Sequence, residues 1–196
     1  MTDSSFAASM RAIVAEAPAQ RHRQMAEWHG SLMRRYGDRL GNFTDEDAER
    51  ISTDGRTLAL VIGHITGWET WLIQAAGEVL SGCRWPEIME LRGYLEGDGA
   101  RRSFETIDEF NAAQARLQSD WPWRRIREQA LCTSAALYAL YMTPGLLTPD
   151  RLEATREYAW SLQPGTRTPI PVGWFLWGVV LEHMAFDHAV DLGLCT

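Results

Sequence analysis

Hydrophobic residues recur at every third or fourth position over most of the chain, which is the spacing of amphipathic helices. Met25 and Tyr36 belong to one such series, which we expect to begin near Pro18 and to end at Gly37, a residue suited to a left-handed helix cap. A shorter helix is expected before it, over residues 4–16. No two segments show the alternation that would predict a convincing pair of strands.

The same pattern predicts helices along the rest of the chain. A second long helix is expected from Thr44, whose hydroxyl can cap it, to Leu80, with residues 53–55 as a point where it can break. The remaining segments are a loop over 83–102, a helix capped by Ser103, a third long helix after Trp121-Pro122 that runs to Met142, a short helix from Thr148 to about 162, a loop over 163–172 and a last helix over 173–192. Long helices with mainly short connections predict an all-α fold, a four-helix bundle with short accessory helices, in a single domain over residues 1–196.

Composition excludes several classes of chemistry. Of the 196 residues, 45% are hydrophobic and 23% charged, as in an ordinary globular protein. All nineteen basic residues are arginine, so a lysine Schiff base and a lysine-bearing phosphate loop are excluded. The formal net charge of -7 argues against a nucleic-acid partner, because a duplex binder needs a basic face.

Cysteines and apolar runs favour a cytoplasmic protein without a membrane partner. Cys83, Cys132 and Cys195 are an odd number without CxxC spacing, so neither a disulfide framework nor a cysteine zinc site is indicated. The longest apolar stretches, 172–181 and 130–142, are too short to span a bilayer. We see no basic-then-apolar leader at the beginning of the chain.

The last predicted helix carries the clearest candidate chemistry. On a straight helix Asp187 lies about 40° from His183, inside an apolar stripe, so we expect both side chains to be buried. An ionised carboxylate there costs several kcal/mol unless an arginine, a protonated histidine or a metal ion meets it. His188 lies about 140° from His183 on a straight helix. A one-residue π-bulge would bring positions i and i+5 onto one face, and such bulges are frequent at functional sites.

The second long helix offers a further ligand. His64 lies on a line of core residues with Leu60, Val61, Trp68 and Leu72. With His183 and Asp187 it would give two imidazoles and a carboxylate, a set that suits Fe(II), Zn(II) or Ni(II). Two simpler interpretations remain open: a hydrogen-bonded core histidine at 64, and a buried Asp–His pair on the last helix.

Three segments resemble a known family. Residues 64–69 (HITGWE), 107–112 (IDEFNA) and 182–188 (EHMAFDH) follow in the order seen in the DinB/YfiT-like bundle superfamily. The details are most similar to its DfsB/ClbS-type members, in which a Gly-Tyr loop, here Gly93-Tyr94, lies between the first two segments. The resemblance covers residues 20–192.

The resemblance implies a four-helix bundle, often dimeric, with a pocket at one end. Many such proteins bind a divalent metal through one histidine of the second helix and a His-x3-His pair of the last. His64 and His183 match the first two ligands, whereas Asp187 stands where the third histidine is usual and His188 follows it. Activities in the superfamily include metal-dependent hydrolysis, thiol-dependent transfer and isomerisation, and protection against a reactive natural product.

The leading hypothesis is a protein that binds a divalent Zn, Ni or Fe ion and acts on a small-molecule substrate, as a hydrolase or as a transferase or isomerase. Its ligands would be His64, His183 and either Asp187 or His188. Whether the protein is an enzyme, and whether a low-molecular-weight thiol takes part, stays open.

Two further residues are assigned helper roles, and two alternatives remain. Glu69 and Asn111 are expected to assist proton transfer or to orient the substrate.

The first alternative is a metal-free protein that binds a small molecule and gives protection against it. The second is a purely structural dimerisation module. Under the leading hypothesis as under the alternatives, broad apolar helix faces in so small a bundle favour a homodimer.

Overall fold

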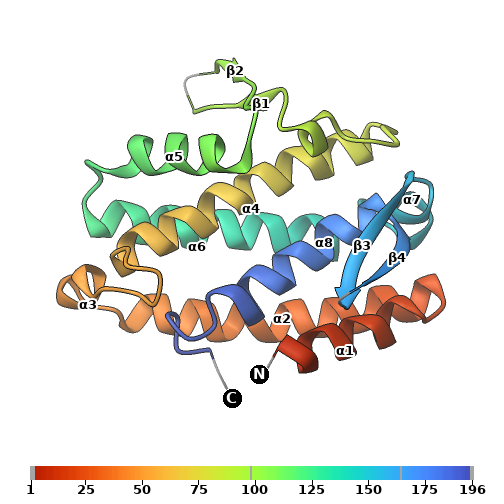
Figure 1. Ribbon diagram of the computed structural model, residues 1–196, viewed down its shortest axis with the longest axis horizontal. Coiled ribbons are helices and arrows are strands. Elements are labelled where there is room, and N and C mark those ends of the chain that lie inside the picture. Colours follow the sequence, from red (N-terminus) through yellow and green to blue (C-terminus); the bar gives the residue numbers. More distant parts are fainter. Residues whose placement is uncertain (1–2, 98, 164, 195–196) are drawn as a thin grey trace.

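The fold is mainly helical, as the pattern predicts. The computed structural model describes residues 3–97, 99–163 and 165–194, and in these it contains eight α-helices and two small antiparallel sheets (Figure 1). The elements in chain order are α1 (Asp3–Val14), α2 (Pro18–Asn42), α3 (Asp45–Glu49), α4 (Leu58–Leu80), the 3-10 helix η1 (Glu87–Glu90), β1 (Tyr94–Leu95), β2 (Arg101–Arg102), α5 (Ile107–Gln118), α6 (Trp123–Met142), α7 (Pro149–Glu153), β3 (Glu157–Gln163), β4 (Thr166–Pro171), α8 (Val172–Glu182) and the π-helical turn η2 (His183–Asp187).

Helix α4 lies at the centre and positions the rest. It contacts α5, α6 and α8, while α2 packs against α6, α7 and α8 (Figure 1). The core between them includes large side chains that are fully buried, among them Trp174, Trp177, Tyr36, Phe6 and Phe110. Burying one such side chain contributes about 1.5–3 kcal/mol, so packing between helices, more than helix propensity, holds the long helices together.

Two predicted helix boundaries differ from the structure. α2 continues past Gly37 to Asn42, because the completely buried Leu40 gains more from packing than a cap at Gly37 would give. The predicted helix from Thr44 divides into α3 and α4. Thr44 forms a capping box with Asp47, whose carboxylate accepts from the Thr44 N–H at 2.9 Å. The segment between α3 and α4 includes residues 53–55, where the sequence predicted the break.

The absence of strands was predicted wrongly. The segment expected to be a helix to about 162, followed by a loop, is a short helix, α7, and then the hairpin β3–β4, which pairs Tyr158 with Ile170 and Trp160 with Thr168. Trp160 and Leu162 are buried while Ala159 and Ser161, which alternate with them, are exposed. This alternation of period two is the signal that the helical interpretation overlooked.

Three smaller features complete the fold. The helix after the 83–102 loop is capped by Thr106, which accepts from the Glu109 N–H at 3.1 Å, and not by Ser103. Cys83 and Cys132 are free thiols, whereas Cys195 lies outside the described residues. Within the described part of the chain, none of the helices is both long and apolar enough to cross a bilayer.

Candidate metal centre

The chain changes its hydrogen-bonding pattern where α8 ends. In η2 the His188 N–H donates to the His183 carbonyl, five residues earlier, at 3.1 Å. This π turn holds one residue more than an α-helical turn, so positions i and i+5 share a face. His183 and His188 therefore lie side by side, with ring centroids 4.7 Å apart. The last helix thus does not run on as an α-helix to residue 192.

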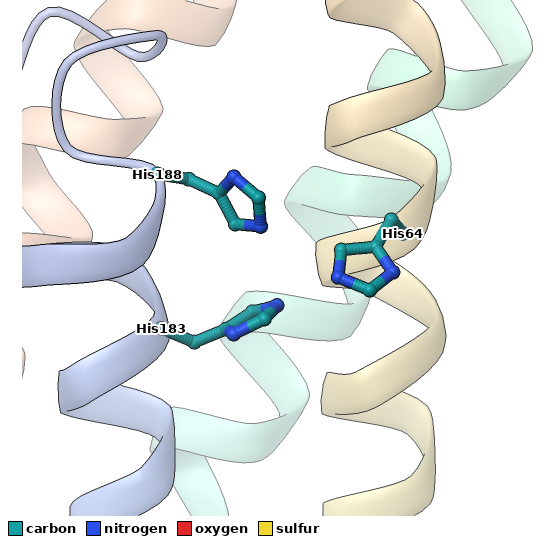
Figure 2. A group of neighbouring side chains, drawn as sticks. All are labelled: His64, His183 and His188. Atoms are coloured by element: carbon teal, nitrogen blue, oxygen red, sulfur yellow. The ribbon is translucent and has the colours of Figure 1, made fainter. Parts of the chain in front are cut away.

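A third imidazole faces these two from α4. The His64 ring centroid is 5.0 Å from that of His183 and 5.3 Å from that of His188, and the three rings converge in Figure 2. One ligand nitrogen from each imidazole lies within 4.8 Å of the others, so the three residues form a group that could hold a metal ion. We call these three residues the histidine cluster.

Asp187 does not have the surroundings that the sequence predicted. Its side chain is 43% exposed, so it is not a carboxylate buried in an apolar stripe. The extra residue of the π turn rotates the chain after His183 away from the straight-helix arrangement. The prediction that Asp187 is buried and therefore needs a cation is wrong.

Asp187 instead acts on His183. Its Oδ2 lies 3.1 Å from Nδ1 of His183. Because a carboxylate only accepts hydrogen bonds, Nδ1 is the donor, and in the neutral ring this leaves the lone pair on Nε2. That Nε2 atom is buried and has no hydrogen-bond partner among the described residues. A carboxylate behind one ring nitrogen and a free lone pair on the other is the usual arrangement of a metal-binding histidine.

A second carboxylate lies behind His188. Oδ2 of Asp191 is 4.0 Å from Nδ1 of His188, and both side chains are more than nine-tenths buried. The Asp191 carboxylate accepts hydrogen bonds from the Thr53 N–H at 2.8 Å and from the Thr53 hydroxyl at 3.0 Å. His188 is thereby placed between the other two histidines of the cluster and a carboxylate held by Thr53.

Burial keeps two of the cluster imidazoles, those of His64 and His188, neutral. It is the main cause that lowers the pKa of His64 to about 3 and that of His188 to about 4, and the neighbouring His183 and Arg56 lower both further. Neutral imidazole is the form that binds metal ions. At neutral pH both rings are therefore in the metal-binding form.

Trp68 separates Asn111 from the cluster. The Trp68 ring packs beside His64 and His183, with centroids 6.5 and 6.3 Å away, and its indole N–H donates to Oδ1 of Asn111 at 3.1 Å. The Asn111 carbonyl oxygen is thus engaged by the indole. Its effect on the cluster would pass through the orientation of Trp68.

Glu69 is buried in the core and hydrogen-bonds away from the cluster. Its Oε1 accepts from the Ser134 hydroxyl of α6, and burial raises the pKa of Glu69 to about 8. The side chain is neutral at physiological pH. With His183 it lines a cavity of about 10 Å³, room for about one water molecule.

Comparison of the chain with protein-family models, with curated proteins and with solved structures finds no match. The family resemblance noted in the sequence is therefore untested by these comparisons.

Proposed function

We propose that the chain binds one divalent cation between His64, His183 and His188 and uses it to act on a small-molecule substrate. The observation that carries this proposal is the convergence of three imidazoles. Among the described residues the buried Nε2 of His183 has no hydrogen-bond partner, and Asp187 lies at the other ring nitrogen. Three nitrogen ligands suit Zn(II), Ni(II) or Fe(II) and leave coordination positions for water or substrate.

A divalent ion held there would lower the pKa of a coordinated water toward neutrality or polarise a carbonyl oxygen. This chemistry fits a hydrolase, or a transferase or isomerase that uses a low-molecular-weight thiol. Residues of the chain that are not ligands would hold the ligand rings in place. Asp187 holds the His183 proton on Nδ1, and Trp68 covers one side of the two rings that it contacts.

The resemblance to DinB-like bundles supports the same proposal. That family takes one histidine from the second helix and two from the last, and in this chain His188 would replace the usual third histidine. The π turn supports this assignment, because it gives positions i and i+5 the alignment that i and i+4 have in an α-helix. A DinB-like arrangement of the helices and a homodimer are part of the proposal.

Metal analysis of protein purified without a histidine tag tests the proposal. We expect about one metal ion per chain, and a loss of most of it in His64→Ala, His183→Ala and His188→Ala. His22→Ala is the matched control, because His22 is a histidine outside the histidine cluster. Its ring packs against Trp177 instead, with the ring centroids 5.0 Å apart. Sub-stoichiometric metal in the wild type, or metal content unchanged in all three variants, would contradict it.

A groove beside α8 favours a second candidate, a metal-free protein that binds a small molecule and protects against it. Trp85, Tyr158, Trp160 and Phe175 line this groove of about 550 Å³, a volume that suits small ligands. Thermal unfolding separates the two candidates. A melting temperature that rises with 2-naphthoate and does not change with EDTA supports metal-free binding of a small molecule. A melting temperature that falls with EDTA supports the metal centre.

A further inference from the structure

The loop that joins α3 to α4 is attached to the chain behind His188. The Arg50 guanidinium donates to the Asp191 carbonyl at 2.8 Å, and Thr53 donates its N–H and its hydroxyl to the Asp191 carboxylate. Because that carboxylate lies 4.0 Å from Nδ1 of His188, these bonds hold residues 50–57 beside the histidine cluster.

Arg56 is fixed within this loop by Asp54. The Asp54 carboxylate accepts from Arg56 Nε at 2.8 Å, from Arg56 Nη2 and from the Arg56 backbone N–H, and it also accepts from the Ser52 hydroxyl at 2.6 Å. The bond from the guanidinium is the main cause that holds the pKa of Asp54 well below its usual range. Among the described residues, Nη1 of Arg56 has no acceptor, so the Nη1–Nη2 edge of the guanidinium remains available for a ligand.

The charge of Arg56 reaches both His64 and His188. After burial and the neighbouring His183, it is the next cause that lowers the pKa of each ring, and its effect exceeds the opposite effect of Asp54. Coulombic effects fall with distance, so the guanidinium lies close enough to both rings for its charge to act on them. Its side chain is 34% exposed, so solvent and solutes can reach it.

We infer that Arg56 binds an anionic group of the molecule held at the metal, and that the site therefore selects small carboxylate-bearing ligands. This inference rests on the proposed metal centre. The planar N–H edge of arginine matches a carboxylate in a two-point contact. The acidic side chains around the cluster have partners of their own: Asp54 binds Arg56, Asp187 binds His183 and Asp191 binds Thr53.

Cobalt(II) makes the site visible and acetate serves as the test anion. The chain is loaded with Co(II) and titrated with acetate, and in parallel with neutral imidazole, while the visible d–d spectrum is followed. Both probes coordinate the metal, but only acetate carries the charge that Arg56 would bind. The variants are Arg56→Gln and Arg56→Lys, with Arg124→Gln as the control, because Arg124 forms an exposed ion pair with Glu128 on α6.

We expect Arg56→Gln to weaken acetate binding by about 10-fold or more, the usual size of one charged hydrogen-bonding contact, and to leave imidazole binding within a factor of about two. Arg56→Lys should fall between wild type and Arg56→Gln, because it keeps the charge and loses the planar edge. Arg124→Gln should match the wild type.

The outcomes separate the inference from the proposal on which it rests. Acetate affinity within a factor of about two of the wild type in both Arg56 variants, with Co(II) still bound, overturns the role of Arg56 and leaves the metal centre standing. An equal loss of acetate and imidazole affinity also overturns it, since that would be a general disturbance of the loop. Failure of the wild type to bind Co(II) overturns the metal centre itself.

Discussion

Replacing Asp187 by Asn should weaken metal binding although it removes no ligand of the histidine cluster. The carboxylate accepts from His183 Nδ1 at 3.1 Å and so keeps the lone pair on Nε2. A neutral amide holds that proton less strongly. Partners of this kind are worth roughly 10–100-fold in metal affinity. Because the Asp187 side chain is 43% exposed, screening by solvent places the effect near the lower end, about 10-fold or 1.4 kcal/mol.

Competition against a chromophoric zinc chelator at neutral pH measures this effect. Asp38→Asn is the matched control, because Asp38 is an exposed carboxylate on α2. Urea unfolding of the metal-free proteins shows whether Asp187→Asn has changed the fold. Equal zinc affinity in wild type and Asp187→Asn, with His183→Ala strongly impaired, would refute the reasoning, because His183 would then bind without the help of its carboxylate partner.

Three further predictions concern stability. Burial raises the pKa of Glu69 to about 8. The free energy of unfolding of the wild type should therefore fall as the pH rises from about 4.5 through 8, by at most about 1.4 kcal/mol per pH unit. Urea titrations of Glu69→Gln should lack this slope. The lowered pKa values of His64 and His188 act in the opposite direction. Their contribution to the free energy of unfolding is present above about pH 6.5 and is lost as the pH falls toward 4 for His188 and 3 for His64. On acidification the metal-free wild type should therefore lose more stability than His64→Gln. Gly178→Ala would place a Cβ 2.2 Å from an indole carbon of β3, so its melting temperature should fall by the equivalent of about 1–3 kcal/mol, whereas Gly77→Ala, where a Cβ meets nothing within 4 Å, should be neutral or stabilising.

The helical part of the fold was predictable because its signals are local. The Thr44 capping box and the series around Met25 and Tyr36 lie within a few turns of sequence, and the structure contains both. The β3–β4 hairpin was missed although Tyr158, Trp160 and Leu162 alternate with exposed residues. A short apolar run fits a helix nearly as well as a strand, and the choice depends on what it packs against.

The candidate site was predictable in part for the same reason. His64 and His183 stand out as polar residues within apolar helical stripes. The choice between Asp187 and His188 depends on one extra residue in one turn, and only the structure shows that turn. The partners of Asp191 could not be predicted, because Thr53 lies 138 positions earlier in the chain.

Anomalous diffraction from crystals grown without chelator tests the metal centre most directly. The account predicts an anomalous peak at the absorption edge of the bound metal, at about 2.0–2.2 Å from one imidazole nitrogen each of His64, His183 and His188. A fully ordered histidine cluster without such a peak, or a peak held by other residues, would contradict it.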